Sequence, residues 1–353
     1  MIDVIQGDCR ERMREGVSAQ AVVCDPPYGL NFMGKDWDAG VPGVEFWRLA
    51  LGCVPPGGYL LAFGGTRKWH RLACAIEDAG WELRDTLMWI HGQGFPKNAQ
   101  VALKPSWEPI LMFRKPLGST VAENVQAHGT GALNVDGCRV MCGRKTPFPQ
   151  KGYARKQSDS TYCFAGDERF STRGIDKSPE GRWPANLVLD EAAAAMLDEQ
   201  SGESFSSGGR ALDGSPFNGT GSVARDPGFG DTGGASRFFY CAKASTVERN
   251  AGLATGENRH PTVKPVSLMR WLVRLVTPPG GTVFDPFMGS GTTGVACVLE
   301  GFDFVGCETD ADAVEVARRR IAWAEQNGEQ FVEADREARE MAEAGLAQQA
   351  LFA

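Results

Sequence analysis

The sequence predicts an α/β fold, a doubly wound and mostly parallel sheet that is interrupted by a long insertion. Short apolar segments alternate with helical patterns in residues 1–114 and again in residues 260–326, as they do when helices cover both faces of a parallel sheet. Residues 115–259 have few long apolar stretches and are rich in glycine and serine from Ser201 to Ser236. We therefore expect residues 115–259 to be an insertion with mobile loops.

The elements expected in the first segment follow from its apolar patterns. The strand at residues 21–24 is apolar throughout and ends at Asp25. Two prolines and two glycines stop the first helix, and Gly80 offers the left-handed cap that commonly ends a helix. The expected strands are residues 21–24, 59–63, 83–90 and 110–113, and the expected helices are residues 45–54 and 68–79.

The alternation returns after one helix that is expected within the insertion, at residues 190–200. Neither flanking segment holds enough strands for a complete sheet, so we expect both to contribute to one sheet. Residues 327–353 are expected to form an acidic helical tail. The later strands are expected at residues 282–284 and 304–307, and the later helices at residues 266–276, 292–300 and 312–325.

The composition is that of an ordinary globular protein, with 42% hydrophobic and 23% charged residues. No apolar stretch approaches the ~20 residues that a membrane-spanning helix needs, and the first residues lack the pattern of a signal peptide. We expect a cytoplasmic protein with no membrane partner. Most of the ten cysteines stand singly in apolar segments, and the spacing of Cys138 and Cys142 differs from that of common zinc sites, so no metal is expected.

The net charge of −7 is unevenly distributed. Residues 325–343 carry seven acidic residues and two arginines, so the rest of the chain is close to neutral. Six basic residues and no acidic residue lie between positions 139 and 158; such a segment is either a solvated loop or a surface that faces DNA phosphates. These candidate DNA-binding residues are Arg139, Arg144, Lys145, Lys151, Arg155 and Lys156.

A glycine-rich turn, Asp285-Pro286-Phe287-Met288-Gly289-Ser290-Gly291-Thr292-Thr293-Gly294, joins a strand to a helix. Its glycines let the backbone approach a ligand closely at the N-terminus of the helix. Glu308 follows the next strand, where an acid typically binds the two hydroxyls of a ribose. The sequence therefore predicts a cofactor that carries adenosine.

The spacing of Gly289, Gly291 and Gly294 also fits the dinucleotide-binding fingerprint, so an NAD-dependent oxidoreductase is an alternative. Two observations weigh against it. Only 45 residues follow Glu308, too few to complete a dinucleotide-binding sheet in its usual order. The strand also ends in Asp285 and Pro286 rather than leading directly into the glycines.

Asp25-Pro26-Pro27-Tyr28 follows a buried strand, at the position where open α/β sheets bind ligands. Two consecutive prolines fix the backbone and remove two N–H donors, which leaves a carboxylate, carbonyl acceptors and an aromatic face. An exocyclic amine on a nucleobase has two N–H donors and a planar ring. Asp25 and the Pro26 carbonyl could accept both hydrogens while Tyr28 stacks on the ring, provided that the base is flipped out of its duplex. Taken alone, the tetrapeptide could equally be a strand-ending turn.

The motifs and their order resemble the β-group of DNA amino-methyltransferases, in particular its phage- and prophage-borne members. In that group the catalytic tetrapeptide precedes the cofactor-binding motif. The resemblance implies a Rossmann-like methyltransferase fold with this permuted motif order and an inserted target-recognition region. The matching segments are Gln6-Gly7-Asp8, Asp25 to Tyr28, Pro56-Gly57-Gly58, Trp107-Glu108-Pro109-Ile110-Leu111, His260-Pro261-Thr262-x-Lys264-Pro265, Asp285 to Gly294 and Glu308.

The resemblance implies that S-adenosylmethionine is the cofactor and that Asp25, Pro26, Pro27 and Tyr28 are catalytic. Asp8 would contact the adenine of the cofactor, Glu308 would hold its ribose, and residues 115–259 would recognise the target. His260 is interpreted as structural or as lining the cofactor pocket. The other cofactor-binding residues that the resemblance implies are Lys264, Pro265, Asp285, Pro286, Phe287, Gly289, Ser290, Gly291, Thr292 and Thr293.

The resemblance further implies site-specific methylation of double-stranded DNA, as in restriction–modification systems, and a homodimer. N6 of adenine is the favoured target, because an aspartate at the first position of the tetrapeptide is more usual in adenine enzymes; N4 of cytosine is the alternative. C5-cytosine methylation needs a cysteine nucleophile that usually follows a proline, and none of the twenty prolines precedes a cysteine. A DNA-binding protein without catalytic activity is a further alternative.

Overall fold

The computed structural model describes residues 1–30, 40–92, 94, 103–140, 181–205, 231–242, 252–253 and 263–328. Within these residues, nine strands form one sheet in the order β1-β11-β10-β2-β3-β5-β4-β6-β9, in which only β5 runs antiparallel to its neighbours. The strands of this sheet are β1 (Ile2–Gln6), β2 (Ala21–Cys24), β3 (Tyr59–Phe63), β4 (Glu82–Ile90), β5 (Trp107–Arg114), β6 (Leu187–Asp190), β9 (Tyr240–Ala242), β10 (Thr282–Asp285) and β11 (Asp303–Glu308).

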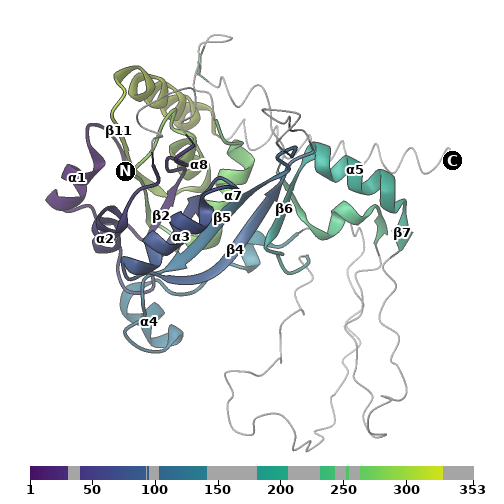
Figure 1. Cartoon of the computed structure of the whole chain (residues 1–353), viewed down its shortest axis with the longest axis horizontal. Helices are drawn as coiled ribbons and strands as arrows, with labels where there is room; N and C mark the ends of the chain where they lie inside the picture. The colour runs from purple at the N-terminus through teal and green to yellow at the C-terminus, as the bar shows by residue number, and fades with distance from the viewer. Residues whose placement is uncertain are drawn as a thin grey trace, which may run out of the picture.

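Helices connect these strands and pack on both faces of the sheet, and Figure 1 shows α1 near one end of the sheet and α5 near the other. The last described helix covers residues 311–328. The other helices are α1 (Cys9–Glu15), α2 (Val44–Gly52), α3 (Trp69–Asp78), α4 (Val121–His128), α5 (Glu191–Ser201), α7 (Val266–Val276) and α8 (Thr292–Glu300), with 3-10 turns η3 (Asp136–Cys138) and η5 (Ala235–Phe238).

Strands from the two ends of the chain interleave at one side of the sheet. β11 lies between β1 and β10, with Val4 opposite Gly306, and β10 lies between β11 and β2, with Val283 opposite Ala21. All of these pairings are parallel. The prediction of a doubly wound, mostly parallel sheet built from both flanking segments is therefore confirmed.

Alternate side chains of the central strands enter two separate hydrophobic clusters. In β3, Leu61 and Phe63 pack with α7 and α8, whereas Leu60 and Ala62 pack with α1, α2 and α3. Every residue of β3 is buried, which is why this strand is apolar throughout rather than alternating. Burial on both faces makes the central strands a rigid support for the loops at their ends.

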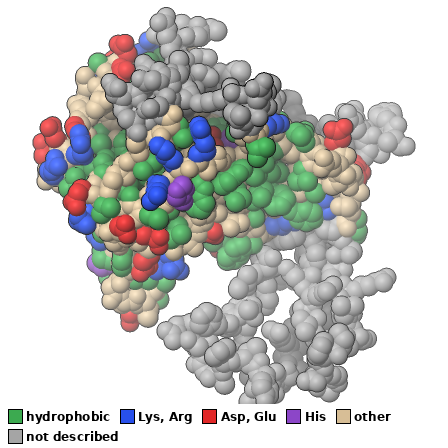
Figure 2. Space-filling model, viewed as in Figure 1, with side chains coloured by type: hydrophobic (Ala, Val, Ile, Leu, Met, Phe, Trp, Pro, Cys, Tyr) green, Lys and Arg blue, Asp and Glu red, His purple; other side chains and the backbone are tan. Residues whose placement is uncertain are grey.

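The cluster beneath α2 and α3 stops at β5. Among the described residues, β4, β6 and β9 contribute no side chain to it, and Met88 of β4 is 40% exposed. Figure 2 shows hydrophobic side chains gathered on this face over the half of the sheet beyond α3.

Residues 115–140, the first part of the predicted insertion, are joined to the main sheet by polar contacts and by one buried turn. A capping box of Thr120 and Glu123 starts α4, and the buried Asn124 donates hydrogen bonds from Nδ2 to the carbonyls of Pro56 (2.8 Å) and Thr130 (2.7 Å). Cys138 of η3 is buried in the cluster that contains α7. The turn η3 thus packs in the core that contains β3, whereas α4 is joined to the rest of the chain through the polar contacts of Asn124.

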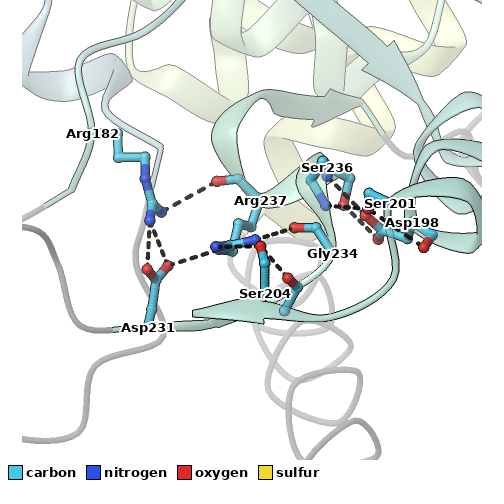
Figure 3. A network of polar contacts seen from close by, with 10 residues as sticks. Arg182, Asp198, Ser201, Ser204, Asp231, Gly234, Ser236 and Arg237 are labelled. Carbon is cyan, nitrogen blue, oxygen red and sulfur yellow. Dashed lines mark hydrogen bonds and ion pairs between the residues drawn. The ribbon is translucent and has the colours of Figure 1, made fainter. Parts of the chain in front are cut away.

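The described part of the predicted insertion also extends the sheet, because β6 pairs with β4 and β9 pairs with β6. A short two-stranded sheet, β7 (Ser204–Phe205) and β8 (Thr232–Gly233), lies beside α5. The buried carboxylate of Asp231 accepts two hydrogen bonds from Arg182, at 2.6 and 2.7 Å, and Arg237 lies 3.6 Å away (Figure 3). Asp198 of α5 holds Ser236 through both carboxylate oxygens. These polar contacts order the segments around β9, where the apolar core is small.

None of the helices in the described part of the chain combines the length and apolarity needed to cross a membrane.

Candidate active site

The carboxyl ends of four neighbouring strands carry the residues that the sequence analysis singled out. β1, β11, β10 and β2 are adjacent and parallel, and they lead into Asp8, Glu308, Asp285 and Asp25 respectively. Parallel strands end at one edge of a sheet, so the structure brings together residues that lie up to 300 positions apart in the chain. This edge is the candidate active site.

Asp25 makes two charge-assisted contacts. The hydroxyl of Tyr28 donates to Oδ1 at 2.7 Å, and the ammonium of Lys264 lies 2.6 Å from Oδ2. The Asp25 side chain is 23% exposed and that of Lys264 is 10% exposed. Although burial opposes its charge, the carboxylates of Asp25 and Glu108 raise the pKa of Lys264, so this residue is a cation. The tetrapeptide thus forms one end of a charged cluster.

Glu108, near the start of β5, forms the other end of this cluster. Its Oε2 accepts a hydrogen bond from the Tyr28 hydroxyl at 3.1 Å and lies 3.5 Å from the Lys264 ammonium. Oε1 lies 3.5 Å from Nε2 of His91. Burial opposes ionisation, but the Lys264 charge and the groups on His91 and Tyr28 lower the pKa of Glu108 to about 2. The sequence analysis assigned Glu108 no contact with Tyr28 or Lys264. The available signal was a carboxylate directly before the apolar residues 110–113.

The Tyr28 ring has a fixed position beside the end of β3. A Cβ atom on Gly65 would lie 3.0 Å from Cδ2 of this ring, so a side chain there would press on the ring and require it to shift by a few tenths of an ångström. Burial is the main cause that raises the pKa of the Tyr28 hydroxyl, and the charges of Asp25 and Glu108 add to it. Tyr28 therefore acts as a hydrogen-bond donor to both carboxylates.

Asp285 organises the glycine-rich turn from the end of β10. Its Oδ2 accepts a hydrogen bond from the Thr293 hydroxyl at 2.5 Å, and its Oδ1 accepts one from the Phe287 amide at 3.0 Å. Gly289 and Gly291 adopt φ angles of 53° and 80°, in the left-handed region that favours glycine. Burial raises the pKa of Asp285 to about 7, despite the hydrogen bonds from Thr293 and Phe287.

A pH dependence of stability follows from this raised pKa. The stability contributed by protonated Asp285 is fully present below its ordinary pKa of 3.8 and is lost as the pH rises through about 7. Between pH 5.5 and 8 we expect this group to lower the free energy of unfolding by about 2 kcal/mol, or several degrees in Tm. Asp285→Asn keeps the shape without the titration, so its Tm should vary less with pH in thermal unfolding. Parallel pH profiles of Tm for wild type and variant would contradict this cause.

Glu308 and Asp8 stand on neighbouring strand ends, where Gln6 is opposite Glu308. Glu308 accepts hydrogen bonds from three backbone amides, of Gly289 at 3.0 Å, Thr309 at 2.7 Å and Asp310 at 2.9 Å. Asp8 caps α1 and forms an ion pair with Arg10. Both carboxylates are only partly buried, whereas Gly289 and its neighbours in the turn are buried. Two accessible carboxylates beside a fixed backbone turn fit a nucleoside with ribose hydroxyls.

Arg320 donates hydrogen bonds to the glycine-rich turn from the neighbouring helix 311–328, a contact that the sequence analysis did not predict. Its side chain is fully buried, and Nη1 donates to the Ser290 carbonyl at 2.6 Å, to Ser290 Oγ at 3.1 Å and to Thr292 Oγ1 at 3.0 Å. It lies on the face of helix 311–328 that also buries Ala317 and Ile321. An arginine within an apolar helical stripe was the available signal.

The remaining predicted cofactor residues lie around the same turn. Pro286 is buried, and the Phe287 ring stacks on Phe46 with centroids 5.0 Å apart. Pro265 precedes α7 and accepts a hydrogen bond from Met269 through its carbonyl. Lys264 contacts Asp25, so the structure brings it to the tetrapeptide; a cofactor contact for it stays a prediction, and His260 lies outside the described residues.

Of the six basic residues predicted to face DNA, only Arg139 is described. Its guanidinium donates to Asp136 at 2.9 Å and to the Gly181 carbonyl at 3.1 Å, and it lies 5.3 Å from the centroid of the Trp183 ring. In this structure Arg139 therefore joins two parts of the chain, and its contact with DNA stays a prediction. Arg144, Lys145, Lys151, Arg155 and Lys156 lie outside the described residues.

The fold and this edge define a doubly wound α/β protein whose candidate site is assembled from both ends of the chain. Residues 19–319 match the model of a DNA methylase family, N6_N4_Mtase. The chain belongs to this family.

Two curated relatives are type II methyltransferases. M2.DpnII of Streptococcus pneumoniae is 38% identical over 75 residues, 21% of this chain and 26% of that protein. M2.MboI of Moraxella bovis is 38% identical over 64 residues, 18% of this chain and 23% of that protein. The matched regions thus span about a quarter of each relative's length.

Two solved structures have weaker likeness. The complex of M1.HpyAVI with SAM aligns over 91% of this chain and 100% of that one, with 18% identity and a TM-score of 0.47. The cytosine-N4-specific PvuII DNA methyltransferase aligns over 89% and 84%, with 15% identity and a TM-score of 0.47.

Proposed function

We propose that this protein transfers a methyl group from S-adenosylmethionine to the exocyclic amino group of a base flipped out of double-stranded DNA, with N6 of adenine as the target. The observation that carries the proposal is the Asp25 carboxylate, held at a strand end beside the glycine-rich turn of the neighbouring β10. The membership in a DNA methylase family supports it.

The residues on the cofactor side fit S-adenosylmethionine. Glu308, fixed by three backbone amides, is suited to accept hydrogen bonds from the ribose hydroxyls, and Asp8 on the next strand end is suited to the adenine. The turn from Asp285 to Thr293 would hold the methionine part. When bound, S-adenosylmethionine supplies a methyl group on a positively charged sulfur.

The residues on the base side would make the amino nitrogen a better nucleophile. The lone pair of this nitrogen is delocalised into the ring. Asp25 and the Pro26 carbonyl would accept its two hydrogens and favour a pyramidal geometry. Because positive charge develops on the nitrogen during transfer, a fixed carboxylate stabilises the transition state more than the ground state.

Sequencing that distinguishes N6-methyladenine from N4-methylcytosine, on DNA from cells that express the protein, tests the target. We expect N6-methyladenine at one defined site. N4-methylcytosine would establish the alternative, which the same donors on the amine also allow.

Calorimetry should detect binding of S-adenosylmethionine and not of NAD, whereas binding of NAD alone would support an oxidoreductase.

Substitutions of Tyr28 should separate its ring from its hydroxyl. Stacking of a base on an aromatic side chain contributes about 1–3 kcal/mol, so Tyr28→Ala should weaken capture of the DNA base by about 5- to 150-fold. Tyr28→Phe keeps the ring and should retain most of this capture. Fluorescence of 2-aminopurine at the target position measures it, and equal losses in both variants would argue against stacking.

A further inference from the structure

The ammonium of Lys264 faces two carboxylates at once. It lies 2.6 Å from Oδ2 of Asp25 and 3.5 Å from Oε2 of Glu108. The Tyr28 hydroxyl bridges the same two carboxylates, at 2.7 and 3.1 Å. The two acids come from the ends of different strands, β2 and β5, and the cation comes from the residue pair before α7. Three distant segments thus meet around one cation that has two alternative partners.

The contact with Asp25 conflicts with the chemistry proposed for that residue. The target amine needs the Asp25 carboxylate as an acceptor, and it becomes more positive during transfer. A cation 2.6 Å from the same carboxylate neutralises this charge and repels the reacting nitrogen. A lysine that stayed on Asp25 would therefore oppose the reaction, although the contact satisfies a partly buried carboxylate when no base is present.

We propose that Lys264 passes from Asp25 to Glu108 when the target base enters, and that Glu108 is the positioning residue that receives it. This inference rests on the proposed function. The displacement is small, because the ammonium already lies within 3.5 Å of Glu108 and sits on a flexible side chain. Tyr28 remains hydrogen-bonded to Glu108 as its ring stacks on the base. Asp25 is then left with its charge directed at the amine.

A double-mutant cycle tests this movement of Lys264. Its two single variants and its double variant differ in the net charge of Asp25, Lys264 and Glu108. Asp25, Lys264 and Glu108 together carry −1. Glu108→Gln changes this to 0 and leaves Lys264 with Asp25 as its only carboxylate partner in the cluster. Lys264→Met changes it to −2 and leaves two carboxylates without their cation. The double variant restores −1 and leaves Asp25 free of the lysine, while Gln at position 108 can still accept from Tyr28.

We expect Glu108→Gln to lower kcat by on the order of 100-fold, with the affinity for S-adenosylmethionine unchanged. The double variant should have a kcat that exceeds those of both single variants by about 10-fold or more, a sign of strong coupling between neighbouring residues. Glu82→Gln is the matched control, because Glu82 of β4 pairs with Arg114 at the end of β5 that is far from Glu108; its kcat should equal that of the wild type.

Losses that simply add in the double variant would overturn the transfer of Lys264 while leaving methylation by the wild type intact. A wild-type protein that methylates no DNA would instead contradict the proposed function, and this inference with it. If Glu108→Gln does not fold, Glu108→Asp serves in its place. Its retained charge should keep kcat within about 10-fold of wild type, and a kcat 100-fold or more below wild type in a folded protein would contradict the inference.

Discussion

Replacement of Asp25 by alanine should reduce methyl transfer by at least about 10³-fold, while the affinity for S-adenosylmethionine stays within a few-fold of the wild type. The carboxylate is proposed to act on the amine of the base, and the groups suited to the cofactor stand on other strand ends. Lys264 keeps Glu108 as a partner in this variant, so the buried cation retains a counter-charge. Single-turnover kinetics and calorimetry measure the two quantities separately.

Glu308→Ala provides the opposite pattern for comparison. Its carboxylate accepts three backbone hydrogen bonds beside the turn, and we assign it no contact with the amine of the base. The variant should therefore lose affinity for S-adenosylmethionine, whereas the bound cofactor should still react. If Asp25→Ala lost cofactor affinity to the same extent as Glu308→Ala, the assignment of Asp25 to the base would be wrong.

Arg320→Met should destabilise the protein by about 2–4 kcal/mol and weaken binding of S-adenosylmethionine. Nη1 of Arg320 donates to both oxygens of Ser290 and to the hydroxyl of Thr292, and all three residues are buried. Without this donor, the turn loses the support that fixes its backbone. Urea unfolding with and without S-adenosylmethionine measures both effects.

Arg318→Met is the matched control on the same helix. Arg318 is exposed, and its Nη2 donates a hydrogen bond to the Val4 carbonyl of β1 at 3.1 Å, so its loss should change stability by less than about 0.5 kcal/mol. An equally small effect of Arg320→Met would show that the turn holds its shape without the buried arginine.

The central elements could be predicted because their apolar patterns are strong and local. The strand at 59–63 and the helices at 266–276 and 292–300 have the expected bounds, and helix 45–54 differs from α2 by one or two residues at each end. The order of the motifs led us to expect one sheet built from both flanking segments, but the strand β1, which pairs with β11, was not among the expected strands. A strand that is buried on both faces is an uninterrupted apolar segment, so its position can be recognised in the sequence.

The parts that could not be predicted depend on contacts between distant residues. β6 and β9 have only four and three residues, and no helical pattern precedes them in the way that marks the core strands; they are strands because β4 offers an edge to β6, and β6 offers one to β9. Nothing near Glu108 in sequence indicates that Lys264, more than 150 positions later, lies beside it. Residues 115–140 fall in the segment assigned to the insertion because it has few long apolar stretches, and that pattern gives no sign of the contacts of the buried Asn124.

Transfer of an isotopically labelled methyl group from S-adenosylmethionine to duplex DNA tests the central claim most directly. After incubation with the purified protein, digestion of the DNA and mass spectrometry of its nucleosides identify the labelled atom. We expect label on N6 of adenine with the wild type and none with Asp25→Ala. Label on a ring carbon, or no label in any base with a folded protein that binds S-adenosylmethionine, would contradict the account.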